Sequence, residues 1–215
     1  MLRALVGLVV GLAVGLGLTY LAIGDDPDRP RGGDDVPSDR DVLLATWGRS
    51  QRATYTLEGV FRRTPDEGEV VDDPLVVVQR GEDRIALGYG SWDGVVDGRS
   101  VRCLRSGRSG AFRDCTVGDQ VDRDEANRVE LRELERLTGP GSPVYRVTAL
   151  GRGCFLLRVV DGQLPTAHGR RARYCFDPQT GALARVRIEH ADAVDEVIVT
   201  SLTPDVDPAD LPPTS

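Results

Sequence analysis

Residues 53–63 read ATYTLEGVFRR, and apolar residues alternate with polar ones along this stretch. Tyr55, Leu57 and Phe61 fall on one side of an extended chain, and Gly59 lies between them on the same side. A repeat of two residues is the pattern of a strand with one buried face. A glycine inside a strand often marks a bend or bulge. The stretch therefore predicts a half-buried strand that bends at Gly59.

Segments of the same kind follow along the chain, separated by short turns rich in Gly, Asp and Pro. A short strand from Trp92 ends at the hairpin dipeptide Asp97-Gly98. The other segments are 74–80, 84–90, 100–105, 112–117, 144–150, 154–160, 171–176, 183–190 and 194–202. Short connections favour antiparallel pairing, so we expect a meander of roughly nine to eleven strands.

Two helices are expected beside these strands. The first is capped by Ser38 or Asp39, has Val42, Leu43 and Trp47 as its apolar side, and ends at Gly48. The second covers residues 122–138, where Asp122 and Glu125 resemble a capping box and 139–141 (Gly-Pro-Gly) stops the helix. Its apolar residues are Ala126, Val129, Leu134 and Leu137, with Leu131 at the edge. The fold class is therefore α+β or mainly β.

Four cysteines occur in the chain. Cys103 and Cys115 flank one turn-like stretch, and Cys154 and Cys175 flank another. Each pair is placed as a bridge across a hairpin would be, so we expect the disulfides Cys103–Cys115 and Cys154–Cys175. Three pairings are possible, and a zinc site is the alternative. The wide spacing of the cysteines is unlike the close pairs of structural zinc sites.

Residues 4–23 form an uncharged apolar run that would span about 30 Å as a helix, the thickness of a bilayer core. Arg3 precedes the run and acidic residues follow it, which predicts an N-in, C-out orientation in the cell membrane. Cleavage after Gly24 is the alternative and would give a secreted protein. No cysteine follows the run before Cys103, so a lipidated N-terminus is excluded.

The anchor has one face of small residues, because Gly7, Gly11 and Gly15 are spaced four apart. This spacing lets two membrane helices approach closely and would suit a membrane-helix partner; the alternative is that glycine is simply common in membrane helices. The chain is then expected to divide into a signal-anchor (1–24), a charged flexible stalk (25–37), an extracytoplasmic domain (38–203) and a Pro/Asp-rich tail along the sheet edge (204–215).

Composition narrows the function. The net charge is −7, which gives no electrostatic case for nucleic-acid binding. The two histidines, His168 and His190, are expected at the surface without a catalytic role. No nucleophile-base motif, calcium loop or phosphate-binding glycine loop occurs. We therefore expect no catalytic residue, no metal and no cofactor, and a protein that is not an enzyme.

The order of elements resembles the LolA-like superfamily of cell-envelope proteins. The short helix before TYTLEGVFRR (54–63), the helix interrupting the meander, RYCFDPQTGALARVRIEH (173–190) and the ending DVDPADLPP (205–213) carry the resemblance. It is greatest to the actinobacterial LppX/LprG-type branch, although this chain lacks a lipobox cysteine. The resemblance implies a curved antiparallel half-barrel whose concave face is covered by two helices.

It also implies a lipid or another hydrophobic ligand held under the helix at 124–138, without enzymatic activity. The residues expected to line that pocket are Leu57, Phe61, Val77, Leu87, Leu134, Leu157 and Ile188. Ordinary core packing of the same residues is the alternative, because one sequence does not distinguish core from pocket. The alternative function is that of an RseB-like envelope sensor, which acts through protein–protein contacts.

Overall fold

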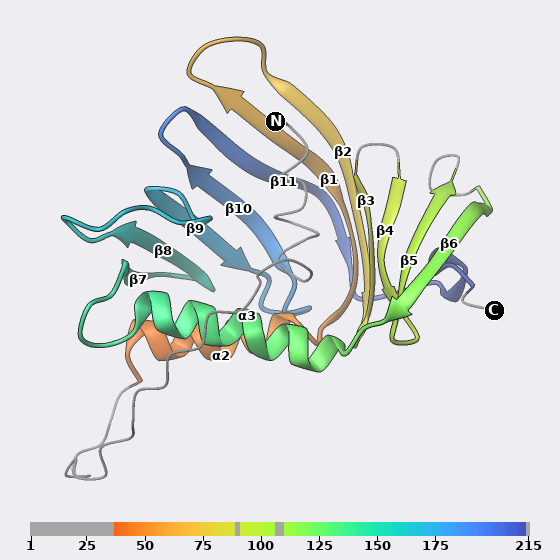
Figure 1. Cartoon of the computed structure of the whole chain (residues 1–215), viewed down its shortest axis with the longest axis horizontal. Coiled ribbons are helices and arrows are strands. Elements are labelled where there is room, and N and C mark those ends of the chain that lie inside the picture. The colour runs from red at the N-terminus through yellow and green to blue at the C-terminus, as the bar shows by residue number, and fades with distance from the viewer. Residues whose placement is uncertain (1–36, 89–90, 106–109, 214–215) are drawn as a thin grey trace.

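The computed structural model describes residues 37–88, 91–105 and 110–213 (Figure 1). Eleven strands form one antiparallel sheet in the order β6-β5-β4-β3-β2-β1-β11-β10-β9-β8-β7. The first six strands are β1 (Thr54–Pro65), β2 (Val71–Arg80), β3 (Asp83–Gly88), β4 (Ser91–Val96), β5 (Arg99–Arg105) and β6 (Phe112–Gln120). The rest are β7 (Tyr145–Gly151), β8 (Cys154–Val159), β9 (Arg171–Phe176), β10 (Leu183–Glu189) and β11 (Ala193–Thr203). The predicted mainly β class and antiparallel sheet are confirmed.

Strand β1 lies at the centre of this sheet, where it pairs with β2 on one side and β11 on the other. Its partner β11 carries one extra residue, because Glu58 faces Ser201 whereas Gly59 faces Val199. A side chain at position 59 would collide with the backbone oxygen of Ile198, so only glycine fits there. The bend predicted at Gly59 is therefore a bulge, which increases the local twist of the sheet.

The sheet is strongly curved, and its edge strands β6 and β7 lie on opposite sides of the molecule (Figure 1). Helices α2 (Asp39–Ser50) and α3 (Arg123–Thr138) contact each other and β7, and they cross one end of the sheet (Figure 1). Helix α3 follows β6 and precedes β7 in the chain. Its 16 residues span about 24 Å, so this single helix bridges the two edges of the sheet.

Helix α2 packs on the sheet through Leu43, Leu44 and Trp47. The predicted apolar side is therefore rotated, because Val42 is exposed and Leu44 is buried in its place. The helix also continues for two residues beyond Gly48, where it was expected to end. The sheet and α3 decide which side of a short helix is buried, and a three-residue apolar pattern leaves this rotation open.

Helix α3 begins and ends where the sequence predicts. The Asp122 carboxylate accepts a hydrogen bond from the Glu125 backbone N–H at 2.8 Å, and Gly139 follows the last turn. Leu134 and Leu137 are buried as expected, but Val129 is exposed. The buried residues of this helix are Arg123, Asn127, Leu134, Leu137 and Thr138. Its inner side is thus polar in the N-terminal half and apolar in the C-terminal half.

The opposite face of the sheet has its own apolar cluster, formed by strands β2 to β5 and the C-terminal segment. Leu211 packs there, in a segment that includes the 3₁₀-helix η2 (Pro208–Asp210). Arg105 pairs with Asp210 at 3.0 Å, and the Thr56 hydroxyl donates to the Asp205 carbonyl at 2.9 Å. The tail was predicted to lie along the sheet edge; instead, it covers part of this face.

Both predicted disulfides are present. Cys103–Cys115 joins β5 to β6, and Cys154–Cys175 joins β8 to β9, where the two cysteines are directly opposite in register. All four sulfurs are used in these bonds, which removes the zinc alternative. Each disulfide ties together two strands close to one edge of the sheet.

No helix in the described part of the chain is long and apolar enough to cross a bilayer. The predicted anchor at residues 4–23, its face of Gly7, Gly11 and Gly15, and the stalk at residues 25–36 lie outside the described residues.

Removing the disulfide between β8 and β9 tests its contribution to stability. We expect the double substitution Cys154→Ala with Cys175→Ala to lower the free energy of unfolding by about 3 kcal/mol, because the bond closes a loop of 21 residues in the unfolded chain. Urea unfolding of the full chain in non-ionic detergent measures this change. A loss below about 1 kcal/mol would show that the bond constrains little.

Candidate functional site

The face of the sheet that α2 and α3 cover carries one continuous apolar cluster, and we call it the helix-side face. Every strand except β4, β5 and β6 contributes to the cluster. Six of the seven predicted pocket residues belong to it: Leu57, Phe61, Val77, Leu134, Leu157 and Ile188. The structure thus brings together residues that lie far apart in the sequence, from four strands and from α3.

Leu87 is the predicted pocket residue that lies elsewhere. It pairs with Val76 across β2 and β3, whereas its neighbour Ala86 pairs with Val77. Because side chains on adjacent positions of a strand point to opposite faces, Leu87 and Val77 lie on opposite faces of the sheet. Leu87 packs against the second cluster, together with Trp92. It is therefore placed away from the other six residues.

Along β1, the helix-side face changes from polar to apolar and back to polar. Tyr55 lies at the end near the helices, Leu57 and Phe61 follow, and Arg63 lies at the far end. These positions share one side of the strand, and at about 3.4 Å per residue the row from Tyr55 to Arg63 is about 27 Å long. A row that is polar at both ends and apolar in the middle is complementary to a long molecule with polar groups at its ends.

The far end of the row is a buried charged cluster around Asp195. Its carboxylate oxygen Oδ2 lies 3.4 Å from Arg63 Nη1 and 3.1 Å from His190 Nε2. The second oxygen, Oδ1, is buried and has no hydrogen-bond partner. Asp73, which pairs with Phe61 across β1 and β2, also has a buried carboxylate oxygen without a partner. Two acceptor oxygens are thus available beside an apolar surface.

The near end of the row begins with three residues in register on adjacent strands. Tyr55 of β1 is opposite Gln79 of β2, and Gln79 is opposite Arg84 of β3. The Gln79 amide donates to the carbonyl oxygens of Ser50 at 2.8 Å and Ala53 at 3.0 Å. Gln79 therefore fixes the segment between α2 and β1 against the sheet.

Glu130 of α3 joins the two helices. It accepts hydrogen bonds from Trp47 Nε1 at 3.0 Å and from Gln51 Nε2 at 3.1 Å. Gln51 also donates to the backbone oxygen of Asn127 at 3.4 Å. The Asn127 side-chain nitrogen Nδ2 is itself buried without a partner. Polar contacts thus replace apolar packing between α2 and the N-terminal half of α3.

His168 was expected at the surface, but only 7% of it is exposed. Its ring packs edge-on against Trp47 and Tyr145, and its Nδ1 lies 2.6 Å from the hydroxyl of Tyr174. Burial lowers the pKa of His168 to about 4 and raises that of Tyr174. At neutral pH both groups are therefore uncharged.

Sequence reasoning missed most of these buried polar residues, although two patterns contain them. Gln79 continues the alternation of Leu75 and Val77 along β2. Arg123 and Asn127 continue the three-and-four spacing of the buried leucines along α3. Polar residues at positions of an apolar repeat were the available signal. His168 lies in a loop without such a repeat, so no pattern predicts its burial.

Comparison with known proteins finds no matching family model and no matching curated protein. The fold is similar to that of a LolA superfamily protein from Nitrosomonas europaea, with 8% identity, a TM-score of 0.35, and coverage of 77% of this chain and 93% of that one. It is also similar to the lipoprotein LppX of Mycobacterium tuberculosis, with 12% identity, a TM-score of 0.36, and coverage of 77% and 97%.

A further similar structure is the MucA/MucB complex of Pseudomonas aeruginosa, with 15% identity and a TM-score of 0.41. The match covers 77% of this chain but only 57% of that one. The LolA superfamily and LppX are the groups that the order of sequence elements resembles.

The burial of His168 makes stability depend on pH. The folded-state pKa of about 4 lies below the ordinary value of 6.5, so the unfolded chain takes up a proton first. Stability from this group is complete above pH 6.5 and falls as the pH drops toward 4, by up to about 3 kcal/mol. We expect the loss between pH 7 and pH 4 to be smaller in His168→Gln, measured by urea unfolding.

Both proteins contain the same carboxylates. The difference between their losses of unfolding free energy therefore isolates the contribution of His168. Equal losses of unfolding free energy in the original chain and in His168→Gln would contradict the burial of a neutral histidine at this position.

Proposed function

We propose that this protein is a membrane-anchored, extracytoplasmic module that binds an amphipathic hydrophobic molecule, such as a single-chain lipid, on the helix-side face. Residues 4–23 supply the anchor, and the domain acts by binding rather than by catalysis. Two disulfides support an oxidising compartment outside the cytoplasm. The uncharged run at residues 4–23 and its flanking charges support the anchor and its orientation.

The observation that carries the proposal is a set of buried polar atoms without partners on and around the helix-side face. They are Asp73 Oδ2, Asp195 Oδ1, Arg123 Nε and Asn127 Nδ2. Buried polar groups are nearly always hydrogen-bonded, and each unsatisfied one costs about 1–3 kcal/mol. Of the seven such atoms in the described residues, these four gather on or around one face. A ligand with polar groups would supply their partners.

The apolar middle of the helix-side face would hold the chain of that ligand. Leu57, Val77 and Ile188 lie on adjacent or nearby strands there. Burial of apolar surface contributes about 25 cal/mol per Å². A single acyl chain can therefore supply most of the binding free energy, while the polar ends of the face determine its orientation.

Helix α3 is the part that must move to admit the ligand. Its C-terminal half packs through Leu134 and Leu137, but its N-terminal half presents Arg123 and Asn127 to the interior. Its outer side carries exposed ion pairs, such as Glu125 with Arg128 and Arg132. Because polar contacts at the N-terminal half are exchangeable with water, this half can open while the leucines stay in place.

Native mass spectrometry of the full chain, released from non-ionic detergent, tests the proposal with 1-monopalmitoylglycerol as the probe. We expect one bound molecule per chain. Phe61→Asp should weaken binding about tenfold or more, because it places a charge in the apolar middle of the face. The matched control is Leu164→Asp, since Leu164 is 83% exposed in a loop, and it should bind like the original chain.

The melting temperature of each variant shows whether it folds. Phe61→Trp is a second variant at the same position and introduces no charge. Equal binding by Phe61→Asp and Leu164→Asp would place the ligand elsewhere. A chain that binds no probe and carries no co-purified acyl species would contradict the proposal and favour an interaction protein.

A further inference from the structure

Arg123 is a buried cation without a partner. Only 7% of the residue is exposed, and among the residues that the structure describes it forms no hydrogen bond or ion pair. Its guanidinium nitrogen Nε is fully buried. A charged group in such a place costs several kcal/mol unless an opposite charge compensates it. A partner that supplies this charge is therefore expected.

The surroundings of Arg123 add positive charge. Burial and, second, the like charge of Arg84 lower the pKa of Arg123 to about 10, so the group still carries its proton at neutral pH. Arg123 is also the first residue of α3, where the helix dipole is positive. An arginine at this position is thus disfavoured by three separate effects.

The acidic group that acts on Arg123 electrostatically already has other partners. Glu130 attracts Arg123 only weakly through space, and its two carboxylate oxygens accept hydrogen bonds from Trp47 and Gln51. Asp122, the residue before Arg123, caps the helix by binding the Glu125 backbone N–H. The carboxylates of Asp122 and Glu130 are therefore committed to the helices.

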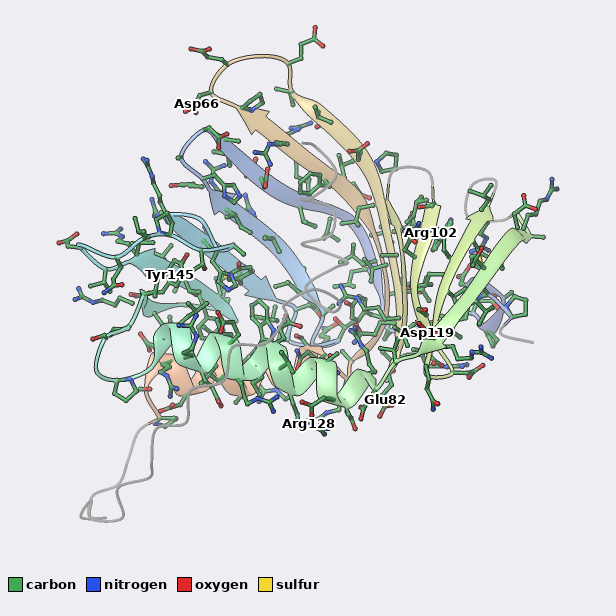
Figure 2. The ribbon with its side chains drawn as sticks, in the orientation of Figure 1. Asp66, Glu82, Arg102, Asp119, Arg128 and Tyr145 are labelled. Carbon is green, nitrogen blue, oxygen red and sulfur yellow. A yellow bond between two sulfur atoms is a disulfide. The ribbon has the colours of Figure 1, made fainter. Side chains whose placement is uncertain are left out.

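The sheet beneath Arg123 carries a second guanidinium, that of Arg84, and the hydroxyl of Tyr55, which donates a hydrogen bond to Gln79 Oε1 at 3.4 Å. Tyr55 and Arg84 lie in one row on the helix-side face with Gln79 between them, and both act on Arg123 electrostatically. Figure 2 shows Glu82, in the turn between β2 and β3, at the same end of the molecule as α3. The row thus lies at the near end of the apolar surface, where a ligand chain would terminate.

We propose that Arg123, with Arg84 and Tyr55 beneath it, forms a binding site for the oxyanion headgroup, carboxylate or phosphate, of a single-chain amphipathic ligand. This assignment rests on the proposed function, because the chain of the ligand lies on the apolar part of the helix-side face. The planar guanidinium binds an oxyanion through two parallel hydrogen bonds, which fixes the orientation of the ligand.

Native mass spectrometry of the full chain with two probes tests the headgroup site. Palmitate carries the anion, and 1-monopalmitoylglycerol carries the same chain without a charge. We expect the original chain to prefer palmitate by about tenfold or more, because hydrogen bonds between ionised groups are about twice as strong as those between neutral groups. In Arg123→Gln the preference should fall to about twofold or less, while the neutral probe binds as before.

Two matched variants complete the test. Arg123→Lys keeps the charge and should keep most of the preference. Arg128→Gln removes an exposed arginine from the outer side of the same helix, where Figure 2 shows it pointing away from the sheet, and should keep all of it. Without ligand, Arg123→Gln should melt at the same temperature as the original chain or higher, because it removes an unpaired buried charge.

Four outcomes would overturn the assignment. The first is an unchanged preference in Arg123→Gln, and the second is an equal loss in Arg128→Gln. The third is a lower melting temperature of ligand-free Arg123→Gln, which would show a structural role. The fourth is stabilisation by inorganic phosphate alone that depends on Arg123 without any palmitate preference, which would identify a free anion. Failure to bind either probe would instead contradict the proposed function itself.

Discussion

The structure depends on one constraint of chain connectivity: α3 joins the two strands that lie at opposite edges of the sheet. Strand β6 ends one edge and β7 ends the other, and the chain passes directly from the first to the second through α3. A straight helix of 16 residues is about 24 Å long, and only residues 121–122 and 139–144 add to it, so the connection limits how far apart the edges can lie. The sheet therefore curves, and α3 lies across its helix-side face.

The two faces of the curved sheet are covered by different segments of the chain. The opposite face is partly covered by the C-terminal segment, which Arg105 holds through Asp210, and it buries its own apolar cluster. The helix-side face is covered by helices whose contacts are partly polar, and four of the seven buried polar atoms without partners in the described residues lie on or around it. A disulfide near each edge ties the outer strands to their neighbours. Covalent bonds thus fix strands near both edges of the sheet, whereas helices α2 and α3 are held on the helix-side face partly by polar contacts.

The sequence predicts the strands, the antiparallel class, the helix boundaries of α3 and both disulfides, because each follows from local patterns. It does not predict which face a residue occupies where both faces are buried. Val76, Val77 and Val78 are apolar in succession, so alternation does not separate the two clusters, and Leu87 is consequently assigned to the wrong side of the sheet. The burial of His168 depends on contacts between distant segments, which no local pattern contains, whereas the burial of Arg123 is indicated only by its position in the repeat of α3.

The central claim is that the helix-side face beneath α3 binds an amphipathic molecule and that α3 opens to admit it. Hydrogen exchange of the full chain in detergent, followed by mass spectrometry with and without palmitate, tests this claim most directly. In the free protein, the N-terminal half of α3 should exchange faster than its C-terminal half, and ligand should slow exchange in α3, β1 and β2 while β5 stays unchanged. Ligand-induced protection confined to the strands at the edges of the sheet, with α3 unaffected, would contradict the account.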